Sequence, residues 1–424
     1  MSFDASQLYD PSSWSDNDAI HKLFAQMRAE DPVHFCESTI FPDLWHVTKH
    51  ADIFDVERRT KDFLNEPRLI IFNREQETQI REETGGSLNR IRSLVTYDAP
   101  EHMKLRLLTQ SWFMPKNLSK LQSKIGGSVE RAFSEIGARD GNCDFASDVA
   151  TEYPLRVIMD VLGVPEGDYG MLLRLTQELF GPEDPDTRRD VEEGISADAA
   201  QEQTILEMFA YFTELTKAKM ADPKDDVASI VANAVVDGEP LDDMAKLGYY
   251  IIVATAGHDT TSYSLSEAVH QLAKDPELFA RLKSDPDTVA PLVTEEAIRY
   301  ASAVRHFIRT AAHDTTLGGK PINAGESVIL WYPSGSRDED VFEDPHHFNI
   351  DRDQSTRHAA FGHGAHMCLG MHLARQEITA FLKALAARVD TLKLNGAPKY
   401  MQANFVGGIK SLPVDMALSL ETVA

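Results

Sequence analysis

HAAFGHGAHMCLGMHLAR, residues 358–375, places one cysteine between a glycine-rich loop and the start of a predicted helix. Gly362 and Gly364 allow the backbone to bend and to approach a flat cofactor where a side chain would collide. Cys368 precedes the helix, so free backbone N–H groups and the positive helix end should favour its thiolate. A thiolate is a strongly electron-donating axial ligand for iron. The stretch therefore predicts that Cys368 binds the iron of a haem.

Two other interpretations of Cys368 stay open. It could be a buried structural cysteine at a helix start. It could also bind zinc together with His363 and His366, but structural zinc sites normally use paired ligand sets. The other cysteines, Cys36 and Cys143, lie far away in the sequence and form no C-x-x-C pair. The zinc interpretation is therefore the weaker of the two.

The same stretch follows a ten-residue pattern, F-G-x-G-x-(R/H)-x-C-x-G. It resembles the haem-binding loop of the cytochrome P450 family, the haem-thiolate monooxygenases. The resemblance implies haem b with Cys368 as the axial ligand of its iron. His366 would then hydrogen-bond a haem propionate, and Gly370 would let the new helix lie close to the porphyrin. The cofactor contacts implied within the loop are Phe361, Gly362, His366, Cys368 and Gly370.

A second motif, A-G-H-D-T-T, lies in the middle of a predicted long helix, residues 247–272. A glycine, an acid and adjacent threonines are poor helix formers, and such local exceptions often mark a site. We expect the helix to widen at Gly257, with Asp259 and Thr260 as an acid–alcohol pair that passes protons inward. A capped helix kink is the alternative. The motif also occurs in the family, where it implies that Ala256 lies against haem and substrate.

Basic residues mark a third candidate region. Asp98 and Pro100 should open a helix, on which His102 and Arg106 share a face because they are four residues apart. The resemblance implies that this face, together with Arg309, contacts the haem propionates. The alternative is an ordinary solvated basic face. Nearby lysines could form a landing area for an acidic electron donor, or simply be solvated: Lys104, Lys116, Lys120 and Lys124.

Glu296 and Arg299 form an E-x-x-R pair, whose spacing permits an ion pair on one helix face. Such pairs are common on surfaces. In the family, this pair is structural and fastens the core beside the cysteine loop, usually with an arginine from a P-x-R-F segment. This chain has His347 in that place. The third partner is left open between His347, Arg352 and none.

Residues 65–95 have no clean sequence period, and we expect them to form a long, partly helical, mobile connection. The resemblance places the substrate pocket along this connection and along residues 175–210, within a largely helical region. An acidic stretch rich in proline and glycine falls where the family has a flap over the substrate entrance. Packing in a helix core is the alternative role for each apolar side chain. The candidate substrate contacts are Leu94, Phe180, Ile252, Ala256, Val304 and Phe405.

The whole chain sets wider limits. Its 424 residues, 42% of them hydrophobic, can bury a large core, and the net charge of 42 − 67 = −25 argues against nucleic acid and anionic membranes. An odd number of widely spaced cysteines fits a reducing compartment. No signal peptide and no run of roughly 20 apolar residues is present, so we expect a cytoplasmic monomer.

We expect a mainly α fold with a small β region, at about residues 32–50 and 305–335. Residues 1–424 would form a single cytochrome P450 domain, with haem between the central long helix and the cysteine-loop helix. The segments PKDDV, ATAGHDTTS, GAHMCLG and NFVGG look closest to the bacterial alpha-terpineol monooxygenase branch.

The resemblance implies insertion of one O₂ oxygen into a C–H bond of a small hydrophobic substrate, a monoterpenoid or an aromatic hydrocarbon. The chain has no flavin or dinucleotide fingerprint, so electrons would come from NAD(P)H through ferredoxin reductase and a 2Fe-2S ferredoxin. A hydrogen-peroxide-dependent peroxygenase and a non-catalytic haem sensor are the alternatives. An intact Asp259–Thr260 pair argues against the peroxygenase.

Overall fold

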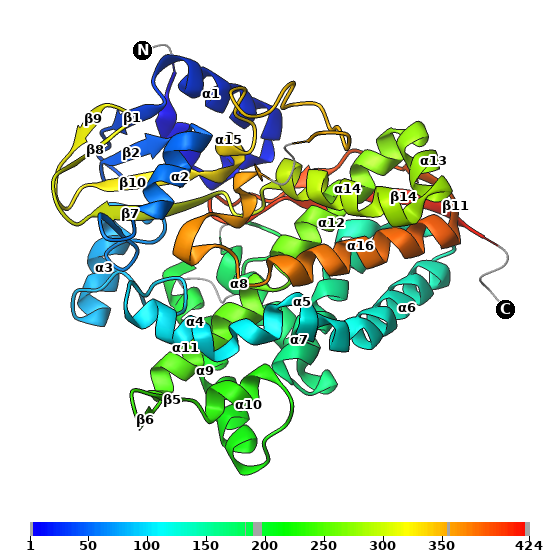
Figure 1. The fold of residues 1–424 in the computed structure, drawn as a ribbon, viewed down its shortest axis with the longest axis horizontal. Helices are drawn as coiled ribbons and strands as arrows, with labels where there is room; N and C mark the ends of the chain where they lie inside the picture. The colour runs from blue at the N-terminus through cyan, green and yellow to red at the C-terminus, as the bar shows by residue number, and fades with distance from the viewer. Residues whose placement is uncertain (1–2, 183, 190–196, 354–356, 420–424) are drawn as a thin grey trace.

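A computed structural model describes residues 3–182, 184–189, 197–353 and 357–419. Strands β1, β2, β7 and β10 lie beside the N-terminal helix α1 on one side, and helices make up most of the rest (Figure 1). The mainly α fold with small sheets is therefore confirmed. The longer helices are α1 Asn17–Glu30, α2 His50–Arg58, α3 Arg74–Thr84, α4 Glu101–Thr109, α6 Gln122–Ala138, α7 Glu152–Leu162, α8 Tyr169–Phe180, α9 Ala197–Ala221, α11 Asp243–Ala256, α12 Asp259–Lys274, α13 Pro276–Ser284, α14 Pro286–Ala301 and α16 Met371–Arg388. Shorter ones are α5 Pro115–Leu118, α10 Val227–Ala232 and α15 Tyr332–Gly335.

The largest sheet has the strand order β1-β2-β10-β7-β3. Strands β10 and β2 run parallel, and the other neighbours run antiparallel. The predicted β regions at 32–50 and 305–335 are confirmed, because they supply four of these five strands. The bounds are β1 Val33–Cys36, β2 Leu44–Val47, β3 Phe63–Leu64, β7 His306–Ala311 and β10 Ser327–Trp331. Smaller sheets contain β4 Asn142–Asp144, β5 Val235–Val236, β6 Glu239–Pro240, β8 Thr315–Leu317, β9 Lys320–Ile322, β11 Val389–Leu394, β12 Lys399–Tyr400, β13 Ile409–Ser411 and β14 Pro413–Leu418.

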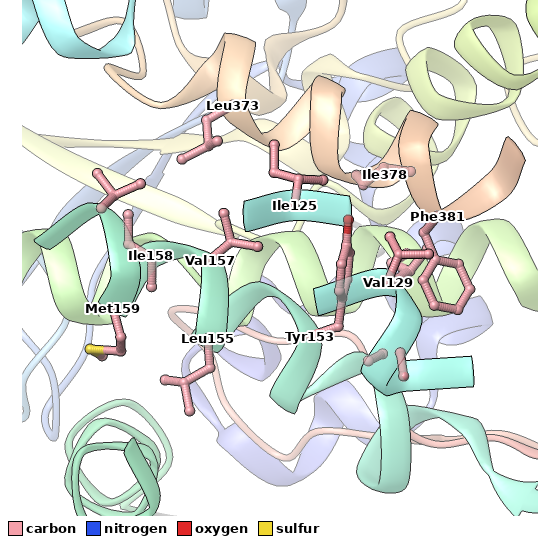
Figure 2. Close-up of a cluster of buried hydrophobic side chains, with 14 of the residues drawn as sticks. Ile125, Val129, Tyr153, Leu155, Val157, Ile158, Met159, Leu373, Ile378 and Phe381 are labelled. Atoms are coloured by element: carbon pink, nitrogen blue, oxygen red, sulfur yellow. The ribbon is translucent and has the colours of Figure 1, made fainter. Parts of the chain in front are cut away.

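Helix α16 is fixed by the main hydrophobic core. Figure 2 shows its Ile378 and Phe381 facing apolar side chains of α6 and α7. The Phe381 ring lies 5.3 Å from that of Phe133 and 5.4 Å from that of Tyr153. Burying a side chain of this size stabilises the fold by about 1.5–3 kcal/mol. The packing therefore holds the helix that follows the cysteine loop.

The predicted helix 247–272 is two helices, α11 and α12, which break at Gly257 and His258. A Cβ atom at Gly257 would lie 2.3 Å from Cγ1 of Ile158, so α7 packs against the break too closely for a side chain. The expected widening at this glycine is thus a full interruption. The interruption leaves the A-G-H-D-T-T motif at a helix junction.

One detail of residues 65–101 differs from expectation and another agrees with it. Asp98 does not cap α4; its carboxylate accepts hydrogen bonds from the backbone N–H groups of Asn65 and Glu66, at 2.9 and 3.0 Å. The carboxylate that was predicted to cap α4 is therefore occupied by the backbone of the loop at Asn65 and Glu66. The partly helical connection is confirmed as α3, which begins with a capping box at Asn73 and ends at Gly85 with φ 72°.

Within the residues that the structure describes, no helix combines the length and the apolar character needed to cross a membrane.

Candidate functional site

A cavity of about 390 Å³ lies between the α11–α12 junction and the cysteine loop. Its wall is mostly apolar and includes nearly all predicted site residues. Asp259 is not part of the wall, and the side chain of Phe180 lies outside the described residues. The predicted residues that line the cavity are Leu94, His102, Arg106, Ile252, Ala256, Thr260, Val304, Arg309, Phe361, Gly362, His366, Cys368, Gly370 and Phe405.

Cys368 faces this cavity. Its backbone N–H donates to the carbonyl of Phe361 at 2.8 Å, which closes the loop, and its side chain is exposed. The structure thus contradicts the buried structural role. Although the thiol opens onto the cavity, desolvation by the surrounding protein raises its pKa, and the N–H groups of Gly370 and Met371 and nearby arginine charges oppose this rise. The helix start thus favours the thiolate as expected, and a metal cation beside the sulfur would favour it further.

The zinc interpretation receives no support. Among the described residues, no three histidine, cysteine or acidic side chains lie close enough together to hold a metal ion.

The loop glycines have different neighbours. Gly362 and Gly364 have φ values of 65° and 68°, so the predicted bend is confirmed. A Cβ atom at Gly364 would lie 2.4 Å from the backbone oxygen of Glu57, and one at Gly362 would lie 3.1 Å from its Oε1. A side chain at either Gly362 or Gly364 would therefore collide with the end of α2. A Cβ at Gly370 would meet open space.

One end of the cavity is cationic. The rings of His102 and His366 stack with centroids 3.8 Å apart, and Arg106 donates to the carbonyl of Met367 at 2.8 Å. Burial lowers the pKa of His102 to about 4. Burial and the charges of Arg309, His102 and Arg106 lower the pKa of His366 to about 2. A bound anion would relieve this repulsion, so the cluster fits carboxylate groups of a ligand.

Two buried acids on the cavity wall were missed by the sequence analysis. Glu377 on α16 is fully buried, and neither carboxylate oxygen has a hydrogen-bond partner in the described structure. Burial raises its pKa well above the ordinary value. Glu57 on α2 lies at the cationic end. Neither residue belongs to a motif on which the sequence analysis relied, so no signal used there singled them out.

The acid and the alcohol of the second motif point to different partners. Asp259 Oδ1 lies 3.0 Å from Nε2 of His258, whereas the Thr260 hydroxyl donates to the carbonyl of Ala256 at 3.1 Å. Among the described contacts, no direct hydrogen bond joins the two. The predicted pair is therefore separated in this conformation, with Thr260 on the cavity wall and Asp259 held behind it by His258.

Both ring nitrogens of His258 face hydrogen-bond acceptors, which favours the doubly protonated ring. Its Nδ1 lies 3.1 Å from the carbonyl of Ala254, which can only accept, and its Nε2 faces the Asp259 carboxylate. Burial acts to lower the pKa of His258, but the Asp259 charge and the hydrogen bonds to Asp259 and Ala254 raise it overall. Thr176 of α8 lies 3.2 Å from the same Nε2. The sequence analysis assigned no role to this histidine.

The chain resembles known proteins along almost its whole length. A family model for cytochrome P450 matches residues 195–392. Cytochrome P450-terp from a Pseudomonas species is 39% identical, over 95% of this chain and 95% of the relative. The chain belongs to the cytochrome P450 family. Linalool 8-monooxygenase from Pseudomonas putida is 28% identical over 93% of this chain and 95% of its own. The crystal structure of CYP108D1 from Novosphingobium aromaticivorans has a TM-score of 0.89 and 41% identity, covering 97% of each chain.

Membership of the cytochrome P450 family makes this protein a haem-thiolate monooxygenase that binds haem b. The residues present fit that group. Cys368 offers an exposed thiol on the cavity wall, and Arg106 and Arg309, at the end where His102 and His366 stack, offer positive charge for the two carboxylates of a haem. Open space beside Gly370 leaves room for a flat ring.

The Glu296–Arg299 pair of the E-x-x-R motif has a third side-chain partner. Glu296 and Arg299 are fully buried and joined by two hydrogen bonds of 2.7 and 2.8 Å. Nε of Arg352 lies 3.1 Å from Glu296 Oε1, and the N–H of Asn349 donates to the same oxygen at 2.8 Å. His347 contributes only its backbone carbonyl. Of the alternatives left open, Arg352 is therefore the side chain that completes the cluster.

Proposed function

We propose that this P450 inserts one oxygen atom of O₂ into a C–H bond of a monoterpenoid or an aromatic hydrocarbon. The observation that carries the proposal is the cavity, where the Cys368 thiol and the Thr260 hydroxyl share one largely apolar wall. When bound, the haem supplies oxygen activation, with one atom entering the substrate and the other leaving as water.

Cys368 is the proposed axial ligand of the haem iron. The propionates are assigned to the cationic end of the cavity, where Arg106 and Arg309 would donate charged hydrogen bonds to them and His102 and His366 stack. The porphyrin faces and edges are assigned to the apolar and glycine positions of the wall. These are Ala256, Phe361, Gly362 and Gly370.

Thr260 and Asp259 are the proposed proton-transfer residues. The Thr260 hydroxyl already lies on the cavity wall and can pass a proton to a group bound there. The Asp259 carboxylate can reach the Thr260 hydroxyl only if it leaves His258. We therefore propose that rotation of the Asp259 side chain carries the proton across the helix junction.

We expect Thr260→Ala to retain haem and substrate binding while product per NAD(P)H falls by roughly a hundredfold, the lower end of the range for a lost acid–base group. The electrons should appear as hydrogen peroxide, because protons no longer reach the oxygen in time. Product and peroxide are measured together in the same turnover assay.

Thr261→Ala is the matched control, since Thr261 is the next residue and also contacts the cavity. Its coupling should stay near that of the wild type. Normal coupling in Thr260→Ala, or equal losses in both variants, would count against the assigned role of Thr260.

The proposed substrate contacts come from separate parts of the wall: Leu94, Ile252, Ala256, Val304 and Phe405. Phe180 remains part of the proposal, with its side chain outside the described residues. Apolar surroundings of this kind favour a hydrocarbon skeleton with few polar groups. The Pseudomonas putida relative is a linalool 8-monooxygenase, which supports a terpenoid substrate.

A spectral-shift screen tests the substrate class. We expect monoterpenoid alcohols or small aromatic hydrocarbons to displace the water ligand of the ferric haem at the lowest concentrations. Rigid four-ring steroids and long fatty acids serve as comparison ligands. Tighter binding of either comparison class would contradict the assignment to small substrates.

The proposed electron donor is a 2Fe-2S ferredoxin reduced by NAD(P)H through its reductase. The lysine landing area receives little support, because Lys104 pairs with Asp237 and Lys120 lies 3.8 Å from Asp225. Lys124 is similarly close to Asp160. Product formation with ferredoxin and reductase, compared with hydrogen peroxide alone, distinguishes the proposal from a peroxygenase.

A further inference from the structure

The cationic end of the cavity contains one carboxyl group whose role the proposed function leaves open. Glu57 lies near the end of α2 and is only 5% exposed. It lines the cavity together with Arg309, Tyr332 and Gly362. An acid is unexpected here, because two propionates would already bring negative charge to the same place.

Only one of the two carboxylate oxygens of Glu57 accepts a hydrogen bond within the described structure. The Tyr332 hydroxyl donates to Oε1 at 2.8 Å, and the nearest nitrogen of Arg309 lies 3.8 Å from that oxygen, too far for a hydrogen bond. Oε2 is buried and has no hydrogen-bond partner in the described part of the chain. Leaving such an atom unpaired costs about 1–3 kcal/mol, so a bound group that pairs with it would stabilise the site.

A protonated carboxyl group suits this position better than an ionised one. Burial raises the pKa of Glu57 to about 7, although Arg309, the Tyr332 hydroxyl and the N–H of His363 oppose the rise. A neighbouring propionate would raise it further, because two carboxylates in a low-dielectric site disfavour each other's ionisation. One proton shared between the two groups removes the repulsion and satisfies Oε2.

We propose that Glu57 is a positioning residue that donates a hydrogen bond from Oε2 to a haem propionate. The proposal rests on the propionates lying at the cationic end, as the proposed function has them. The two carboxyl groups then titrate as one pair. Losing the shared proton adds a negative charge near the haem, which stabilises ferric over ferrous iron. The reduction potential therefore falls as the pH rises through the titration of this pair.

The other groups that face Glu57 come from three elements. Arg309 from β7 contributes a guanidinium group, and burial raises the pKa of Tyr332 from α15 well above 10. The cysteine loop faces Glu57 with the backbone of His363 and Gly364. Burial holds the pKa of the His363 ring below its ordinary value. The Glu57–propionate pair is thus the titrating unit at this end of the cavity.

The test is the reduction potential of the haem-loaded protein from about pH 6 to about pH 9, because a neighbouring propionate would place the pKa of the pair above 7. Glu57→Gln keeps a hydrogen-bond donor but cannot titrate. We expect its potential to stay near the acid-side value of the wild type and to lose most of the pH-dependent fall. Glu77→Gln is the control, because Glu77 is another buried glutamate paired with an arginine, Arg68, and does not line the cavity.

A second variant keeps the inference testable if Glu57→Gln folds poorly. Tyr332→Phe removes the hydroxyl that lowers the pKa of Glu57, so the fall in potential should move to higher pH. A wild-type slope in Glu57→Gln, or an unmoved slope in Tyr332→Phe, would overturn the inference. Failure of the proposed function looks different, since the wild-type protein would then lack a thiolate-type spectrum with reduced haem and carbon monoxide.

Discussion

Cys368→Ala should lose the thiolate signature in the reduced carbon-monoxide difference spectrum, and product formation should fall to background. Cys368 supplies the sulfur proposed to bind the iron, and its side chain is exposed on the cavity wall. Alanine removes the electron-donating axial ligand without adding bulk, so haem that remains bound would have a weaker axial ligand or none. The spectrum reports the ligand directly, independently of substrate and redox partners.

The control is a substitution at one of the other two cysteines. Cys36 and Cys143 are free and buried, at 8% and 6% exposure, and neither lines the cavity. Cys143→Ala should therefore keep the wild-type spectrum, with at most a modest loss of stability from the shortened side chain. An unchanged spectrum in Cys368→Ala would refute the ligand assignment. Loss of the signature in Cys143→Ala as well would mean that the spectrum reports general misfolding.

Features that depend on a short stretch of chain could be predicted from the sequence. The bend of the cysteine loop needs only Gly362 and Gly364. Gly257 marked the place where the long helix would change, but the full break also depends on the close packing of α7. The capping box at Asn73 is equally local, and it would have sufficed to place the start of α3.

Features that depend on distant contacts could not be predicted in this way. Glu57 looks like an ordinary helix residue until Tyr332 and Arg309, more than 250 residues later, enclose it. Asp98 has the spacing of a helix cap, but the loop at Asn65 competes for its carboxylate. The role of His258 likewise depends on where Asp259 turns its side chain, which the motif leaves open.

Glu296→Ala is expected to have the largest effect on folding, lowering stability by about 3–5 kcal/mol, the usual result of removing one partner of a buried ion pair. The loss would leave Arg299 buried with an unpaired charge, and would also remove the acceptor for Arg352 and for the N–H of Asn349. A domain is stable by only about 5–15 kcal/mol, so the yield of haem-loaded protein should drop severalfold. The midpoint of urea unfolding and the ratio of haem to protein absorbance measure both effects.

Glu214→Ala is the matched control for the role of burial. Glu214 and Lys217 have the same spacing as Glu296 and Arg299, but their side chains are 73% and 67% exposed. An exposed pair of this kind contributes at most about 1 kcal/mol, because water screens the charges. If Glu296→Ala were as well loaded and as stable as Glu214→Ala, the buried cluster would not be what fastens α14 to the segment before the cysteine loop. A large loss of stability and haem loading in Glu296→Ala alone would instead show that burial, and not the sequence spacing, makes this ion pair important for the fold.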